Sequence, residues 1–272
     1  GIYNTLIGGL AGTALTTGSG NTILGNQAGD ALTTGNNNVA IGYLALSTED
    51  EHGGNIAMGA GALQVQNAGA HAYNVAVGHN AGTTVSTGVQ NTLIGGRAGD
   101  ALTTGSYNIA IGMDALTIED TGSRSVAIGT NALFNQNYDG DAYNVAIGMS
   151  AGSQITTGVQ NVIVGGLAGD ALTTGGGNVA MGYQALTTAN TDESQNVAIG
   201  NYALNAMDNG STTNTHNTAL GYYSGVAVTT GIQNTLLGAL AGDAITTGGN
   251  NMVIGYNACL LYTSDAADDL LC

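Results

Sequence analysis

The stretch NVAIGYLA, residues 38–45, decides the fold because its pattern returns along the whole chain. The pattern is Asn, any residue, an apolar residue, an aliphatic residue, Gly, two further residues and Ala. Most copies start 17 positions after the one before, and four intervals are longer, at 18, 19 or 21 positions. At the first position only Ser125 replaces Asn, and at the eighth position only Ser224 replaces Ala. The fifteen copies, which we call coils, begin at Asn4, Asn21, Asn38, Asn55, Asn74, Asn91, Asn108, Ser125, Asn144, Asn161, Asn178, Asn196, Asn217, Asn234 and Asn251.

Each coil has the signature of short strands. Large and small side chains alternate with period two in residues 38–42, and a Gly ends the alternation, which is typical of a strand. We expect two short strands per coil, separated by corners. A single coil buries too few aliphatic side chains to offset the entropy lost on ordering it, so coils must stack and share ladder hydrogen bonds. The sequence therefore predicts an all-β fold, a parallel β-roll or β-solenoid of about fifteen 17-residue coils over residues 1–258.

A Gly stands at the fifth position of every coil, directly after the expected strand. A recurring Gly there predicts a backbone corner that needs positive φ or a close approach of two backbones. These corner glycines are Gly8, Gly25, Gly42, Gly59, Gly78, Gly95, Gly112, Gly129, Gly148, Gly165, Gly182, Gly200, Gly221, Gly238 and Gly255.

A second period of four coils overlies the first. The ninth position is Gly in two successive coils and Leu in the next two, and glycine coils regain an aliphatic residue at the twelfth position, as at Leu32 and Val85. Four coils form a super-repeat of 70 residues, lengthened to 73 in the third copy, with starts at positions 4, 74, 144 and 217. Because all length variation falls in leucine coils, we expect their loops to face outward.

The strand positions also predict assembly. The second and fourth positions share one face, which we expect to line the interior, so that Ile111→Asp should damage folding severely. The third position lies on the opposite face and is apolar in every coil, as at Ala40 and Leu93. A strand that is apolar on both faces is covered on both, so we expect neighbouring chains to shield this stripe. The alternative is a monomer whose Ala-rich stripe is tolerated in water.

The unit at residues 38–45, 108–115, 144–151 and 196–203 resembles the head repeat of YadA-like trimeric autotransporter adhesins, and similar repeats occur in bacteriophage tail fibres. The resemblance covers residues 4–258. It implies a left-handed parallel β-roll, a homotrimeric fibre, and attachment to a host surface receptor, protein or glycan, from a bacterial outer surface or a phage virion. This repeat is longer than the adhesin unit and adds a Thr-Thr-Gly segment, and we expect neither a coiled-coil stalk nor a membrane anchor within these 272 residues. Adhesin and phage fibre therefore both stay open.

Composition excludes several other classes. Two basic residues against 18 acidic ones give a net charge of −16, and charged residues make up 7% of the chain. Such a chain has almost nothing with which to neutralise a phosphate backbone, so we expect no nucleic-acid binding. An apolar content of 43% is too high for a disordered linker. No apolar run approaches 18 residues, so we expect no membrane span.

The last fourteen residues, CLLYTSDAADDLLC at 259–272, break the repeat and hold both cysteines. This segment resembles the translation of a transposase adapter used in sequencing libraries, and we expect it to be non-native. The alternative is a genuine cap with a disulfide. Without this segment the chain has no Cys, so cysteine usage does not decide the compartment.

The variable loops of the leucine coils are the predicted ligand-contact regions. They lie at residues 46–54, 63–73, 116–124, 133–143, 186–195 and 204–216. Aromatic rings suit sugar or protein faces, and the acidic clusters favour solvated loops. The candidate contact residues are Glu49, Asp50, Glu51, Tyr73, Glu119, Asp120, Tyr138, Asp139, Asp141, Tyr143, Asp192 and Glu193.

Threonine pairs raise a second functional class, ice binding. Pairs such as Thr16-Thr17, Thr33-Thr34 and Thr103-Thr104 recur in the glycine coils and could order water if they formed a flat rank. Adjacent threonines point to opposite faces of a strand, however, and each pair of leucine coils interrupts the rank.

No residue pattern indicates catalysis. The four histidines, His52, His71, His79 and His216, are scattered over the sequence without a metal-ligand spacing, and there is neither a nucleophile elbow nor a phosphate-binding loop with Lys. The acidic clusters could gather Ca²⁺, but their spacing matches no known calcium loop. We therefore expect a non-enzymatic protein without a cofactor or a metal.

Overall fold

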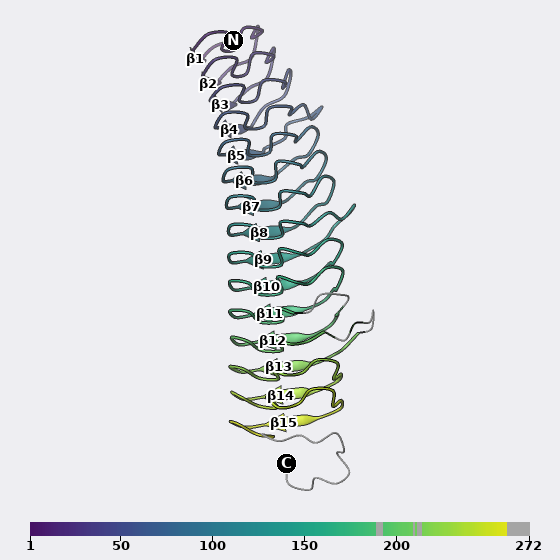
Figure 1. Ribbon diagram of the computed structural model, residues 1–272. Coiled ribbons are helices and arrows are strands. Elements are labelled where there is room, and N and C mark those ends of the chain that lie inside the picture. Colours follow the sequence, from purple (N-terminus) through teal and green to yellow (C-terminus); the bar gives the residue numbers. More distant parts are fainter. Residues whose placement is uncertain (189–192, 209, 211–213, 260–272) are drawn as a thin grey trace. The chain divides into compact units, whose positions relative to one another are not determined.

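A computed structural model describes residues 1–188, 193–208, 210 and 214–259. The chain divides into two compact units, Gly1–Ala142 and Tyr143–Cys272. Each unit is a stack of parallel three-residue strands, one per coil (Figure 1), and no helix occurs among the described residues. The predicted all-β β-solenoid is therefore confirmed.

The first unit holds eight of the strands described and the second holds seven. Those of the first unit are β1 (Thr5–Ile7), β2 (Thr22–Leu24), β3 (Val39–Ile41), β4 (Ile56–Met58), β5 (Val75–Val77), β6 (Thr92–Ile94), β7 (Ile109–Ile111) and β8 (Val126–Ile128). Those of the second unit are β9 (Val145–Ile147), β10 (Val162–Val164), β11 (Val179–Met181), β12 (Val197–Ile199), β13 (Thr218–Leu220), β14 (Thr235–Leu237) and β15 (Met252–Ile254).

The register of the strands follows the repeat. Val39 of β3 pairs with Thr22 of β2 on one side and with Ile56 of β4 on the other, in parallel. Where a loop makes the coil two residues longer, the pairing is kept, because Ile56 still faces Val75 of β5. The ladder therefore fixes the strand segment of each coil and leaves the loop free to vary in length.

The expectation of two strands per coil is wrong within the described residues. In the coil that starts at Asn38, the chain turns through positive φ at Leu44 (56°), Leu46 (51°) and Gly54 (79°), after the corner Gly42. Such frequent left-handed residues prevent a second extended segment. The backbone beyond the strand still bonds to the next coil, since the Leu46 amide donates to the Ala62 carbonyl at 3.0 Å.

The corner glycines combine an unusual backbone conformation with close stacking. All fifteen have φ between 130° and 145°. At Gly25, where φ is 141°, a Cβ atom would lie 2.5 Å from the carbonyl oxygen of Gly42 in the next coil. Only a residue without a side chain fits both requirements.

The assignment of inner and outer strand faces is the reverse of the one expected. Third-position residues such as Ile23, Leu93 and Ala110 are fully buried in the interior of the coil. The second and fourth positions point outward, and Ile56 and Met58 are 36% and 38% exposed. Because the coil is narrow, Ala or a single larger side chain fills its interior, and the branched residues are left outside. The stripe expected to be shielded by other chains is therefore the core, and the outer face is the second and fourth positions.

The core is filled from the ninth position in leucine coils and from the twelfth position in glycine coils. In leucine coils the ninth residue, such as Leu46, is buried, and its positive φ is a conformation that L-residues adopt at a cost. In glycine coils a twelfth residue such as Leu32 is buried instead. A Cβ at Gly29 would lie 2.9 Å from Leu32 Cδ1 and 3.1 Å from Ile23 Cδ1, so no side chain fits there.

The first-position Asn residues of most coils form a buried ladder of amide side chains inside each unit, and Ser125 stands at this position in one coil. The side chain of Asn91 donates through Nδ2 to the Gly105 carbonyl at 2.8 Å, and its Oδ1 accepts from the Asn108 amide at 2.9 Å. Asn91 and Asn108 are fully buried. Asn91 thus satisfies a carbonyl of its own coil and an amide of the next one, which is what buried backbone groups require. Most first-position Asn residues do the same, but Asn55 Nδ2 has no hydrogen-bond partner.

Candidate functional site: the loops of the leucine coils

The loops of the leucine coils lie at the edge of the solenoid opposite the strands. In the first unit the loops that follow β4 and β8 extend farther than those of neighbouring coils (Figure 1). This agrees with the insertion of two residues in those two coils. The predicted contact residues therefore lie on a variable edge, but their side chains do not all point outward.

Three of the predicted contact residues are buried, and the expectation that they are solvated is wrong for them. These are Glu49, Glu119 and Glu193. Glu119 shows the reason: its carboxylate accepts from the Gly122 amide at 2.7 Å, from Gln136 Nε2 at 2.9 Å and from the Tyr138 amide at 3.3 Å. A carboxylate that is buried needs such donors, and the loop backbone supplies them. Glu49 and Glu119 occupy the twelfth position, where glycine coils bury an aliphatic residue.

Other predicted contact residues reach the surface. Tyr73 and Tyr143 are 56% and 51% exposed, and Glu51 and Asp139 are exposed as well. Tyr138, Asp50 and Asp120 are partly buried, and Asp141 is exposed and forms an ion pair with Arg124. Asp192 lies outside the described residues.

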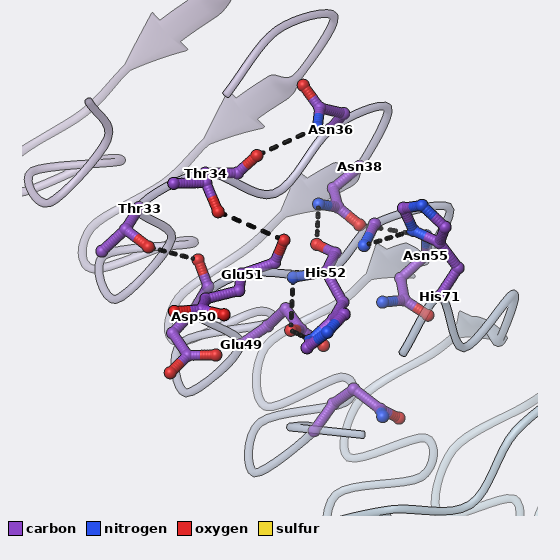
Figure 2. A network of polar contacts seen from close by, with 12 residues as sticks. Thr33, Thr34, Asn36, Asn38, Glu49, Asp50, Glu51, His52, Asn55 and His71 are labelled. Carbon is purple, nitrogen blue, oxygen red and sulfur yellow. Dashed lines mark hydrogen bonds and ion pairs between the residues drawn. The ribbon is translucent and has the colours of Figure 1, made fainter. Parts of the chain in front are cut away.

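The partly buried aspartates connect their loop to the preceding coil through their backbone. The carbonyl of Asp50 accepts from the amide of Thr33 at 2.6 Å and from its hydroxyl at 2.8 Å, and Figure 2 shows the hydroxyl bond. The same arrangement recurs in the second super-repeat, where the Asp120 carbonyl accepts from the hydroxyl of Thr103 at 2.9 Å. Thr33 and Thr103 thus hold a leucine-coil loop, and the hydroxyls of Thr16, Thr156 and Thr229 donate instead to a carbonyl of the next glycine coil, so these hydroxyls are already engaged by protein. This does not favour a rank of threonines that orders water.

Glu49 lies in an unusual electrostatic environment. Its Oε1 accepts from the His52 amide at 3.1 Å, whereas its buried Oε2 has no hydrogen-bond partner. Burial raises the pKa of the Glu49 carboxyl above its ordinary value, because desolvation outweighs the bond from the His52 amide and the attraction of the His52 ring. The site therefore holds a carboxylate whose charge is incompletely compensated.

Two of the histidines that looked scattered in the sequence lie together. The rings of His52 and His71 are 6.5 Å apart and nearly perpendicular, and the His71 ring lies 5.9 Å from that of Tyr73. His71 Nδ1 accepts from the Gly53 amide at 3.1 Å (Figure 2). The sequence analysis missed this pair because it numbered residue positions from the first residue of each coil. Counted backward from the next coil, both histidines stand three residues before an Asn.

A group of four tyrosines in the second unit was also missed. Ring centroids are 5.6 Å apart for Tyr183 and Tyr202, 4.7 Å for Tyr202 and Tyr223, and 4.4 Å for Tyr222 and Tyr223. Tyr183 and Tyr222 are 43% and 54% exposed. All four occupy the sixth or seventh position of a coil, directly after the corner glycine, so the repeat itself was the signal that could have found them.

Comparisons of the chain with protein-family models, with curated proteins and with solved structures found no match. Among the residues that the structure describes, no helix has the length and hydropathy needed to cross a membrane.

Proposed function

We propose that this chain is a segment of a structural attachment fibre in which several copies pack side by side along their strands. The observation that supports this most directly is the apolar outer face of the strands. In the first unit Leu24 and Ile94 are 42% and 37% exposed, and in the second unit Ile147 and Leu220 are 38% and 43% exposed. Exposed apolar side chains that recur along one face of a protein mark an interaction site.

A second copy of the same chain is the partner that best fits this face. The exposed aliphatic residues repeat with the spacing of the coils, so another copy in the same axial register offers an equally spaced apolar row. Homo-oligomers with closed symmetry commonly use such self-complementary patches. The resemblance to trimeric adhesin heads favours three chains around one axis. Packing against other copies would cover the face that this narrow solenoid leaves outside.

The loops of the leucine coils are then the surface displayed to a ligand. They lie away from the strand face, and they carry exposed groups such as Glu51, Tyr73, Asp139 and Tyr143. Aromatic rings beside polar groups suit a protein or a glycan. We infer that the ligand is a receptor on a host surface, and that the fibre acts outside the cell as part of a bacterial adhesin or a phage tail fibre, without enzymatic activity.

Sedimentation velocity of the full chain tests the assembly. A trimer should sediment as a particle with three times the mass of the 26.8 kDa chain. The double variant Ile94→Asp, Ile111→Asp should sediment as a monomer with unchanged circular dichroism, because both residues are on the outer face. A wild-type chain that stays monomeric at the highest concentrations would refute side-by-side packing.

Surface binding tests attachment separately. Fluorescently labelled chain is applied to cultured eukaryotic cells, to bacterial cells and to an array of immobilised glycans. Binding to one of these that is lost when residues 133–143 are replaced by the shorter segment of a glycine coil supports display by the loops. If binding is absent, or is unchanged by loop replacement, the attachment role is wrong even where the trimer forms.

A further inference from the structure

The loop that follows β3 gathers three groups that ligate metals. One ligand atom each from Glu49, Asp50 and His52 lies within 4.8 Å of the other two. Glu49 is fully buried and the other two residues are partly buried. Figure 2 shows the Glu49 carboxylate and the His52 ring pointing toward one another, and Glu49 Oε1 is 3.5 Å from His52 Nδ1.

Two atoms of this cluster are buried and have no hydrogen-bond partner. They are Glu49 Oε2 and His52 Nδ1. The contact between Glu49 Oε1 and His52 Nδ1 does not meet the geometry of a hydrogen bond, so it leaves the ring nitrogen unpaired. A buried polar atom without a partner is costly, and a carboxylate oxygen more so. A cation that accepts electron pairs from both atoms would remove this cost.

The second super-repeat provides an internal comparison, because each of its residues has a counterpart in the first. It retains the two acids as Glu119 and Asp120, but Gly122 stands in place of His52 and Asp141 in place of His71. There the Glu119 carboxylate is fully engaged, with one of its bonds coming from Gln136 Nε2.

The counterpart of Gln136 in the first super-repeat is turned elsewhere. Gln66 Nε2 donates to the Ser86 carbonyl at 3.1 Å, and Gln66 Oε1 accepts from Asn74 Nδ2 at 2.6 Å. Gln66 therefore gives nothing to Glu49. The unpartnered carboxylate oxygen and the two histidines occur together in the first super-repeat, and neither feature occurs at Glu119.

We propose that Glu49, Asp50 and His52 bind a divalent transition-metal ion such as Zn²⁺. Two carboxylate oxygens and one imidazole nitrogen form a donor set that suits Zn²⁺ better than Ca²⁺ or Mg²⁺, which prefer oxygen ligands alone. His71 is a positioning residue: its Nδ1 accepts from the Gly53 amide, and its ring lies against that of His52. The ion would hold the loop after β3 in one conformation, with the His52 ring beside that of His71 in the loop after β4.

A metal-free arrangement is the competing explanation. Asn55 Nδ2 is also buried without a partner. If this amide donated to Glu49 Oε2, both atoms would be satisfied without an ion. The two explanations differ in the role of His52. Metal binding needs the His52 ring as a ligand, whereas a hydrogen bond between Asn55 and Glu49 does not involve it.

Titration of the full chain with Zn²⁺ against a chromophoric chelator tests the proposal. The titration uses a Cys259→Ser, Cys272→Ser background, because thiolates bind Zn²⁺ strongly. We expect one equivalent to bind and the affinity to fall at least 100-fold in His52→Ala. His71→Asn should weaken binding less than His52→Ala does, because His71 contacts the His52 ring but makes no hydrogen bond to a proposed ligand. Asp50→Asn should weaken binding, whereas the matched control Asp120→Asn should not.

The visible absorption of bound Co²⁺ supplies a readout that loop stability alone would not move. We expect a band of a four- or five-coordinate ion with the background chain and none with His52→Ala. Circular dichroism verifies that each variant is folded. The proposal is wrong if neither ion binds, if His52→Ala binds as tightly as the background chain, or if Ca²⁺ competes at equal concentration.

Discussion

Asn108→Ala should destabilise the first unit at one defined place in the amide ladder. The Asn108 side chain donates through Nδ2 to the Gly122 carbonyl at 2.9 Å, and its Oδ1 accepts from the Ser125 amide at 2.9 Å. Gly122 and Ser125 are buried, so water cannot replace the lost side chain. An unsatisfied buried group costs about 1–3 kcal/mol, so two such groups predict a loss of about 2–6 kcal/mol.

Amide hydrogen exchange measures this loss where it occurs. Long repeat arrays unfold in parts, so a single midpoint of unfolding is a poor measure. A loss of about 2–6 kcal/mol corresponds to exchange that is about 30-fold to 10⁴-fold faster, at roughly 1.4 kcal/mol per factor of ten. We expect this acceleration in peptides that contain residues 108–125, with much smaller changes in the second unit.

Asn26→Ala is the matched control, because Asn26 is an exposed Asn in the same unit. It should change stability by less than about 0.5 kcal/mol. If Asn108→Ala exchanges no faster than Asn26→Ala, the ladder is not a source of stability and the role given to the first position of each coil is wrong.

Three further changes test the inner face, the corners and a partly buried acid. Ala110→Asp should prevent folding of the first unit because Ala110 is fully buried, whereas the outward Ile111→Asp should stay folded by circular dichroism. Gly25→Ala should speed amide hydrogen exchange in peptides that contain residues 22–42, since the added Cβ would lie 2.5 Å from the Gly42 carbonyl oxygen of the next coil. Burial raises the pKa of Asp170 above 3.8. The stability that this carboxyl group contributes is therefore largest at acid pH and declines as the pH rises through its pKa in the folded state. In urea unfolding, Asp170→Asn should stabilise the chain at pH 7 but not at pH 3.

The period of the repeat made most of the fold predictable. The repeat has a regular spacing, and in each copy a Gly follows a short aliphatic segment. These two features located every strand of the described chain to within a residue or two. The second strand per coil was wrong because sequence patterns do not reveal that residues such as Leu44 and Leu46 adopt positive φ. L-residues rarely take that conformation, so it is expected only when stacking enforces it.

The inward face was misassigned because both strand faces are apolar. Size suggested that Val and Ile would be inside, but the coil is too narrow for a face of branched residues. A better signal was present in the sequence: the third position is Ala in all six leucine coils, and Ile or Leu only in glycine coils such as those of Ile23 and Leu93. The third position is thus small where the ninth is Leu and can be large where the ninth is Gly. Positions whose side-chain volumes compensate in this way share one interior.

Of the candidate site, sequence reasoning located the loops but not the environment of their side chains. Acidic residues in a loop are usually solvated, yet Glu49 and Glu119 occupy a position that is buried in glycine coils such as the one containing Leu32. That position was visible from the repeat. The pairing of His52 with His71 depended on the lengthened coil, which shifts the second histidine when positions are counted from the first Asn.

The ladder explains why loops can vary without loss of the fold. The strand fixes the start of each coil, and in most coils the first-position amide also bonds to a carbonyl near the end of the same coil, as Asn108 Nδ2 does to Gly122. In the coil lengthened to 19 residues, the Asn74 amide still donates to Asn55 Oδ1 at 3.1 Å, against 2.8 Å from Asn91 to Asn74 in a 17-residue coil. Insertions are thus absorbed between two fixed points. Stability resides on the strand side and chemical variety on the loop side, which is the division that the proposed attachment role requires.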